Sequence, residues 1–257
     1  MKSGRWSKEE VNKLKRLVKE YSSYDKIVSQ FNRSKSSVTN KVNSLGLRLK
    51  SNVNEDFFYR KDEISYYILG YWFADGCIMK KSGGYYFSIV SNDVKHLLRM
   101  KKEMEITTKL YKNSNDAYEI RVGNKKLINN MIKDFKANYR KTHITKIPRS
   151  IIPNKYFYDF LRGYFDGDGS INLQKYTVKS GEIRASLSNI KFTGAEIIIK
   201  SLYEIIGFGA LSEDSRKNNC FYLSFYSDDM RNLLDKMYNN SKIHLKRKYD
   251  IYLMEVL

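Results

Sequence analysis

Two aspartates in matching contexts are the residues of this 257-residue chain best suited to chemistry. Asp75 follows an apolar helical pattern within Tyr67–Ile78 (YILGYWFADGCI), and Asp168, 93 residues later, follows a similar one within Phe160–Ile171 (FLRGYFDGDGSI). Each carboxylate would stand at a helix C-terminus, where the macrodipole makes a negative charge unfavourable by about 0.3–1 kcal/mol. Two such carboxylates brought together repel each other, and a divalent cation between them is the simplest compensation. The alternative is that each acid only ends its helix.

Small residues predict how the two helices meet. Gly70 and Ala74 lie four residues apart in the first segment, as do Gly163 and Gly167 in the second. This spacing puts both small residues on one helix face, where they let another helix backbone approach closely. We therefore expect the two helices to pack on each other and to bring the acids together.

The acids belong to an internal repeat. Two strands, a helix, two strands and a helix are expected after Asp75, and the same order follows Asp168. Residues 61–140 and 154–257 therefore form a first half and a second half, joined by a connector, 141–153, that contains both prolines. The predicted fold class is α+β: two pseudo-symmetric αββαββα halves whose antiparallel sheets form a saddle, plus a small N-terminal three-helix domain.

Alternation along two strands predicts which side chains face the core. The inward residues are expected to be Ile183, Ala185 and Leu187 in the second half and Tyr118, Ile120 and Val122 in the first. The outward residues are expected to be Arg184, Ser186 and Ser188 in the second half and Glu119 and Arg121 in the first. The outward set would line the saddle.

Residues 1–50 predict a separate module of three short helices. Ser7 and Glu10 form a capping box before the first helix, and Ser34 caps the third. The pattern resembles a Myb-like or helix-turn-helix DNA-binding module, with the third helix in the major groove. The DNA-contacting candidates are Arg33, Lys35, Ser36, Ser37, Asn40 and Lys41. The alternative is a packing or oligomerisation domain. Residues 51–60 are polar and without a period, which predicts a linker.

The charge of the chain points to a polyanionic partner. The formal net charge is +19, and 21 Tyr and 13 Phe add rigid contact area among the basic residues. A basic organellar or ribosomal-type protein, or a lysine-rich genome, would share this composition. Neither a signal peptide nor an apolar membrane-spanning run is present in the sequence, so we expect no membrane partner and no secretion. The expected location is the cytoplasm or nucleoid of a bacterium or phage-infected cell, or an organelle matrix.

The segments ending in Asp75 and Asp168 resemble the two signature motifs of the LAGLIDADG homing endonucleases, in the single-chain form. Phe73 stands where the family usually has a second, non-catalytic acid, whereas the second copy keeps Asp166. The resemblance implies a monomer that makes a staggered double-strand cut in a long, asymmetric DNA target. It also implies that Asp75 and Asp168 hold Mg²⁺, with the carbonyls of Ala74 and Gly167 as further ligands.

The resemblance also implies a DNA-binding saddle and residues that orient water. The family often has a lysine at the end of the second strand of each half; here the first half offers Asn92, and the second offers Gly194 with Lys191 nearby. The saddle candidates are Ser88, Arg121, Arg184, Ser186 and Ser188. The basic tail candidates for phosphate contact are Lys246, Arg247 and Lys248, for which a solvated surface run is the alternative.

A second function stays open at this stage. The chain could be a cleavage-inactive nucleic-acid-binding protein, either a maturase that acts on intron RNA or a transcription regulator. The presence of both Asp75 and Asp168 favours the enzyme, whereas Asn92 and Gly194 favour the binding protein.

Overall fold

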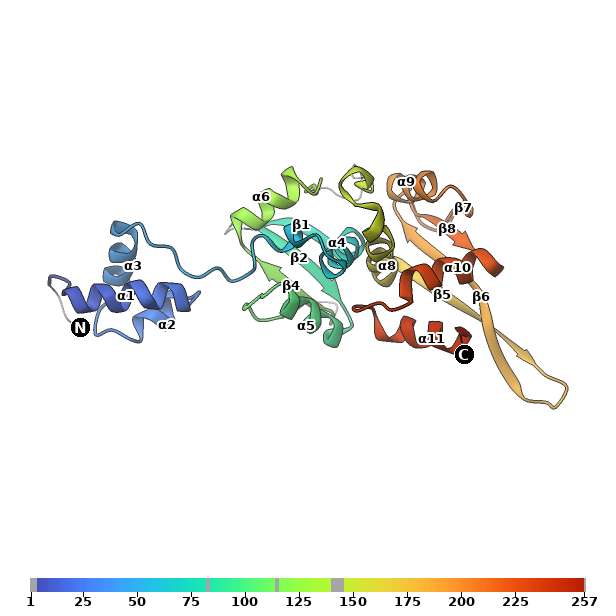
Figure 1. The fold of residues 1–257 in the computed structure, drawn as a ribbon, viewed down its shortest axis with the longest axis horizontal. Helices are drawn as coiled ribbons and strands as arrows, with labels where there is room; N and C mark the ends of the chain where they lie inside the picture. The colour runs from blue at the N-terminus through green and yellow to red at the C-terminus, as the bar shows by residue number, and fades with distance from the viewer. Residues whose placement is uncertain (1–3, 82–83, 114–115, 140–145, 257) are drawn as a thin grey trace.

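The computed structural model describes residues 4–81, 84–113, 116–139 and 146–256. A small N-terminal helical unit stands apart from two α+β units that lie side by side (Figure 1). The helices of the N-terminal unit are α1 (Lys8–Glu20), α2 (Tyr24–Val28) and α3 (Lys35–Ser44). This unit has its own core, made of Leu14, Leu17, Val18, Ile27, Val38 and Val42. The predicted three-helix module is confirmed as a structural unit.

The caps of the N-terminal helices are those predicted. The Ser7 hydroxyl accepts from the Glu10 amide at 3.1 Å, and the Glu10 carboxylate accepts from the Ser7 amide at 2.9 Å. The Ser34 hydroxyl accepts from the amide of Ser37 at 3.2 Å. These bonds satisfy amides at the helix N-termini that have no partner within the helix.

The segment predicted as a linker is largely part of the main body. Residues Phe57–Arg60 form the short helix η1, and Val53, Phe57 and Phe58 are buried in the main core. The ring of Phe58 packs 5.5 Å from that of Phe135 and 6.2 Å from that of Phe87. The prediction of a linker over 51–60 is wrong because these aromatic residues bury apolar area without forming a regular period.

The first half has the predicted order of elements. Its elements are α4 (Glu63–Asp75), β1 (Gly76–Lys81), β2 (Gly84–Ser91), α5 (Val94–Glu103), β3 (Tyr111–Lys112), β4 (Tyr118–Val122) and α6 (Lys125–Lys133). The four strands form an antiparallel sheet in the order β1-β2-β4-β3. Asp62 begins α4 with a capping box, since its carboxylate accepts from the Ser65 amide at 2.8 Å and the Ser65 hydroxyl accepts from the Asp62 amide at 3.0 Å.

The second half repeats this order and adds a final helix. After the short helices η2 (Arg149–Ile151) and η3 (Asn154–Tyr156), its elements are α8 (Phe157–Asp168), β5 (Gly169–Thr177), β6 (Ile183–Gly194), α9 (Glu196–Ile206), β7 (Ala210–Glu213), β8 (Phe221–Phe225), α10 (Ser227–Tyr238) and α11 (Lys246–Val256). The sheet order β5-β6-β8-β7 matches that of the first half. Residues 141–145 of the predicted connector lie outside the described residues. The α+β fold with two similar halves is confirmed.

No helix in the described ranges is long and apolar enough to cross a membrane.

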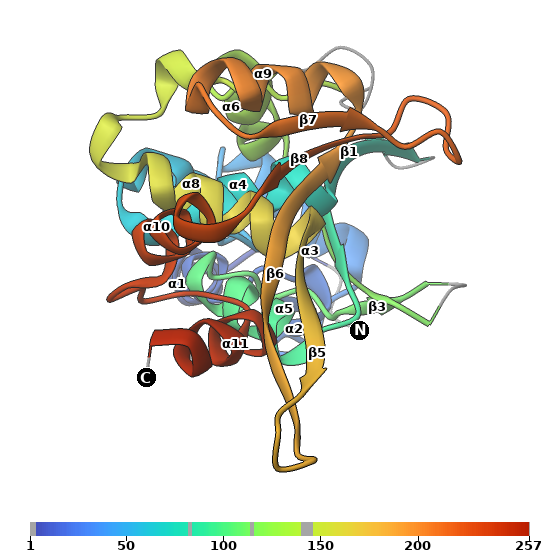
Figure 2. The ribbon, with the colours of Figure 1, turned by 90° about the vertical axis from the view of Figure 1, so that its right-hand side faces the viewer.

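The hairpin of β5 and β6 extends beyond the helices as a two-stranded arm (Figure 2). Its register shifts at Asn172 and Leu173, and Ile183 near its end is 69% exposed. Ala185 is exposed as well. The prediction that Ile183 and Ala185 face the core is wrong. The alternation of apolar and polar residues continues into the part of β6 that no described helix covers.

The helices α4 and α8 pack along the centre of the main core. A Cβ on Gly70 would lie 1.9 Å from the carbonyl oxygen of Phe160, and a Cβ on Gly163 would lie 1.9 Å from that of Tyr67. The two contacts are related by the same 93-residue offset that relates the acids. The predicted close packing through small residues is confirmed, and we call this contact the helix seam.

Candidate active site

The two predicted catalytic aspartates lie together at one end of the helix seam. Asp75 and Asp168 are the last residues of α4 and α8. A Cβ on Gly167 would lie 2.4 Å from the Cβ of Ala74 and 3.3 Å from Oδ2 of Asp75. The Asp75 carboxylate therefore reaches across the seam to the last turn of α8. Burial raises the pKa of the Tyr164 hydroxyl, and the nearby negative charges of Asp168 and Asp75 raise it further.

The oxygen atoms at this end of the seam fit a hard divalent cation. Asp75 and Asp168 would supply carboxylates, and the adjacent Ala74 and Gly167 would supply backbone carbonyls. Mg²⁺ prefers such ligands and usually completes its shell with water and phosphate oxygens. The described residues hold no cluster of three or more His, Cys, Asp or Glu that could enclose a metal by itself. The seam therefore fits a metal shared with a phosphate better than one enclosed by protein.

A cavity of about 270 Å³ lies beside Asp75. Its first-half lining is Tyr71, Asp75, Val90, Ser91, Asn92, Asp93 and Ala117, and its second-half lining is Asp166, Gly167, Leu245 and Arg247. The Tyr71 hydroxyl donates to Oγ of Ser91 at 3.0 Å and so holds the end of β2 against α4. Asn92 and Asp75 thus line one cavity. Arg247 enters the same cavity from the other half.

Lys191 lies on the outer face of β6. Gly169 pairs with Phe192 in the second half, as Gly76 pairs with Ile89 in the first. By this register Lys191 corresponds to Ser88. Gly194 likewise corresponds to Ser91, so its expected correspondence to Asn92 is wrong by one residue. The Lys191 ammonium lies 5.2 Å from the centre of the Tyr222 ring, on the side of the sheet away from the core.

Asp166 is buried and accepts three hydrogen bonds. Its carboxylate accepts from the hydroxyl of Tyr67 at 2.7 Å, the hydroxyl of Tyr238 at 2.5 Å and the amide of Leu245 at 2.7 Å. Burial raises the pKa of Asp166, and the charge of Lys248 and the three donors oppose that shift. The corresponding first-half residue, Phe73, is buried among apolar side chains. Asp166 therefore ties the C-terminal segment to α8, and the first half has no matching acid.

Lys248 does not face solvent as the tail prediction required. It is buried, and its ammonium donates to the carbonyls of Phe165, of Asp166 at 3.2 Å and of Gly169 at 2.7 Å. Burial lowers the pKa of Lys248 to about 8, and the charge of Asp166 counteracts this shift. The predicted phosphate contact of Lys248 is wrong, because its charge is used at the carbonyl end of α8.

The basic tail is not one exposed run, and its position on a helix explains why. Lys246, Arg247 and Lys248 open α11, where the macrodipole disfavours positive charge. Lys246 pairs with Asp250 at 2.7 Å, Lys248 is buried, and Arg247 is exposed beside the cavity. Asp250 lies four residues after Lys246, and this helical ion-pair spacing is the sequence signal that could have shown that the three charges have different partners.

The saddle candidates of the first half also differ in exposure. Ser88 is buried and donates to Glu119 at 2.7 Å, and Glu119 is itself buried under Arg121. The predicted exposure of Glu119 and the predicted DNA contact of Ser88 are therefore wrong. Arg121 stays half-buried, with its guanidinium 4.6 Å from the centre of the Tyr111 ring. In the second half Arg184 is exposed and pairs with Glu182 at 3.1 Å, and Ser186 and Ser188 are half-buried.

In the N-terminal module, Arg33 is a structural residue. It is 3% exposed, donates to Glu10 at 3.0 and 2.8 Å and stacks 4.5 Å from the centre of the Trp6 ring. The predicted DNA contact of Arg33 is wrong because this guanidinium ties α1 to the start of α3. Lys35, Ser36 and Asn40 are exposed on α3, and Ser37 and Lys41 are half-buried. Lys35 pairs with Asp25 at 2.7 Å.

Comparison with known proteins agrees with this architecture. A family model described as a LAGLIDADG-like domain matches residues 62–134. The crystal structure of the I-LtrWI LAGLIDADG homing endonuclease bound to target DNA is 18% identical, with a TM-score of 0.52 over 76% of this chain and 89% of that one. That of I-SmaMI bound to cleaved DNA is 17% identical, with a TM-score of 0.50 over 73% and 86%. No protein with a curated description matches the sequence. The expected resemblance is confirmed at the level of the fold.

Proposed function

We propose that this chain, which carries a LAGLIDADG-like domain and has the fold of the LAGLIDADG homing endonucleases, is a site-specific endonuclease that cuts both strands of DNA. The observation that carries the proposal is the meeting of Asp75 and Asp168 at one end of the helix seam. Two acids at adjoining helix C-termini are unfavourable for stability alone. Their placement is what a two-site phosphodiester hydrolase requires.

The reaction is hydrolysis of one phosphodiester in each strand. A water oxygen attacks phosphorus, the bond to the 3′ oxygen breaks, and the products are a 5′ phosphate and a 3′ hydroxyl, which takes up a proton. Mg²⁺ held by Asp75 and Asp168, with the carbonyls of Ala74 and Gly167, would lower the pKa of the water and neutralise charge on the leaving oxygen. In this proposal Asn92 orients the water in the first half and Lys191 does so in the second.

The two sheets and the N-terminal module form the proposed DNA surface. A net charge of +19 supplies the sequence-independent attraction to phosphate. On the sheets the proposed contacts are Arg121, Arg184, Ser186 and Ser188, and Lys246 adds one at the C-terminal helix. On α3 they are Lys35, Ser36, Ser37, Asn40 and Lys41, which would lengthen the target read in the major groove. Both acids lie in one chain, so a monomer suffices for a staggered cut in an asymmetric site.

The test is cleavage of the uninterrupted DNA locus into which the gene is inserted. For a free-standing gene, the substrate is a duplex that the protein enriches from a random-sequence pool in Ca²⁺. We expect a staggered cut with Mg²⁺, loss of cutting by at least about 100-fold in Asp168→Asn, and little change in affinity. Asp228→Asn, which neutralises an exposed acid far from the seam in sequence, is the matched control and should cut normally.

Two results would contradict the proposal. Persistent cutting by Asp168→Asn would show that Asp168 is not a catalytic residue. Tight binding with no cut under any divalent metal would instead indicate a cleavage-inactive binding protein, and binding of the intron RNA in preference to DNA would point to a maturase.

A further inference from the structure

We infer that Arg247, a residue of the second half, serves the cleavage site of the first half, where its guanidinium binds the scissile phosphate beside Asp75. The inference rests on the proposed endonuclease function. It assigns Arg247 a role at one of the two strands only, whereas a tail contact with the DNA backbone would affect both strands alike.

The cavity beside Asp75 needs a cation to accept a phosphate. Three acidic residues line it, Asp75, Asp93 and Asp166. Tyr71, Ser91 and Asn92 add polar groups without charge. Among the described residues that line the cavity, Arg247 alone is positively charged. An incoming phosphate adds negative charge to this group of acids; buried Lys248 already interacts with Asp166 and Asp75, and the Arg247 guanidinium is the cation that the cavity lining adds.

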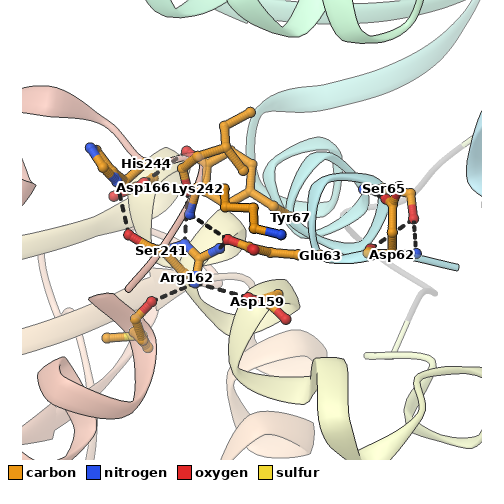
Figure 3. A network of polar contacts seen from close by, with 12 residues as sticks. Asp62, Glu63, Ser65, Tyr67, Asp159, Arg162, Asp166, Ser241, Lys242 and His244 are labelled. Carbon is orange, nitrogen blue, oxygen red and sulfur yellow. Dashed lines mark hydrogen bonds and ion pairs between the residues drawn. The ribbon is translucent and has the colours of Figure 1, made fainter. Parts of the chain in front are cut away.

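The C-terminal segment is fixed to both halves just before Arg247. After α10 ends at Tyr238, the Lys242 amide donates to Glu63 of α4 at 2.6 Å, and Arg99 of α5 donates to the Lys242 carbonyl. Glu63 also pairs with the buried Arg162 of α8 at 3.0 Å (Figure 3). The Leu245 amide then bonds to Asp166 at 2.7 Å. The bonds of Lys242 attach the segment to the first half. The bond of Leu245 attaches it to α8, two residues before Arg247.

At the start of α11, the side chain of Arg247 points in a different direction from those of Lys246 and Lys248. Successive residues of an α-helix point about 100° apart, because 3.6 residues make one turn. Lys246 accordingly pairs with Asp250, and Lys248 is buried under the end of α8. Arg247 between them is exposed at the cavity and forms no ion pair with a described residue. Its planar fork remains available for the two-pronged contact that arginine makes with phosphate.

The two halves thus offer cations from different elements. Lys191 extends from the outer face of β6 in the second half, and the corresponding first-half residue, Ser88, is buried and uncharged. Arg247 supplies to the first half a charge that its own sheet lacks at this position. The two cleavage sites therefore use cations from different positions in the fold, although the two halves are otherwise similar. This difference predicts that cleavage of each DNA strand can be slowed independently.

The experiment follows each strand of the cleaved target separately. A supercoiled plasmid carrying the target distinguishes nicked from linear product, and a duplex labelled at either 5′ end identifies the strand cut. We expect Arg247→Gln to cut one strand roughly 100-fold more slowly, as on removal of a donor that stabilises transition-state charge, and to accumulate nicked plasmid. Lys191→Gln should slow the opposite strand. Arg247→Lys should recover part of the rate, and the dissociation constant measured in Ca²⁺ should change less than about threefold.

The outcomes separate this inference from the proposed function. Equal slowing of both strands with weaker binding would make Arg247 a general phosphate contact and overturn the inference, as would unchanged cutting of both strands. In either case normal cutting by the wild-type chain would leave the endonuclease in place. A wild-type chain that cuts neither strand would overturn both. Arg231→Gln removes an exposed charge of α10 outside the cavity and should cut both strands normally. An unchanged melting temperature for Arg247→Gln excludes misfolding.

Discussion

The carbonyl oxygen of Tyr67 occupies the space in which a side chain on Gly163 would begin, since a Cβ there would lie 1.9 Å from it. The same relationship holds between Gly70 and the carbonyl of Phe160. The backbones of α4 and α8 are therefore in direct contact, and this contact sets the separation of the acids that follow.

Substitution of Gly163 by alanine tests the seam. Gly163→Ala should lower the free energy of unfolding by about 3 kcal/mol or more, because the clash is with backbone that cannot turn aside. Urea denaturation measures the change. Gly123→Ala is the matched control, since its added Cβ would meet the side chain of Tyr86 at 2.9 Å and this ring can move. Equal losses in the two variants would contradict the assignment of special importance to the seam.

Deletion of residues 1–50 tests the N-terminal module. The module has its own core, so the remaining chain should fold without it, bind the target more weakly and show a flatter dependence of affinity on salt. Each lost phosphate contact lowers the slope of log K against log salt by about 0.9. Binding titrations at several salt concentrations provide the measurement.

Single substitutions locate the contact within the module. Lys41→Ala on α3 should reduce the salt slope, whereas Lys8→Ala at the start of α1 should not. A deleted chain with unchanged affinity and slope would show that the module does not touch DNA. Equal effects of the two lysines would argue against α3 as the contacting helix.

His96 predicts a loss of stability in mild acid. Burial lowers its pKa from 6.5 to about 4, and its ring bonds to the Tyr67 hydroxyl at 2.8 Å. The unfolded chain binds this proton more readily, so stability should be complete above pH 6.5 and fall as the pH approaches 4. The full loss from this group is about 3 kcal/mol.

The matched variant for this titration is His96→Gln. Its amide can keep a hydrogen bond to Tyr67 but cannot titrate, so the unfolding free energy between pH 7 and pH 4 should fall less than in the wild type. Chemical denaturation at each pH measures the difference. Parallel curves for the two proteins would show that other groups cause the acid sensitivity.

Local features of the sequence predicted much of the fold. The helix ends at Asp75 and Asp168, the capping boxes and the repeated order of elements depend on neighbouring residues, so periodicity and turn chemistry were sufficient. The seam was predictable too, because four-residue spacing of small residues defines a face within one helix. Alternation failed at Ile183, since the same pattern continues whether or not another element covers the strand.

The sequence by itself determined which residues could do chemistry and which helices present them, because those properties lie within about ten residues of chain. Tertiary structure alone decided that Arg33 and Lys248 are buried partners of Glu10 and of the carbonyl end of α8, and that Arg247 reaches the cavity of Asp75. The physical reason is that the neighbours of a charged side chain decide whether it is buried in an ion pair or exposed to bind a ligand. Those surroundings come from segments up to 172 residues away, as Arg247 is from Asp75, which no local pattern records.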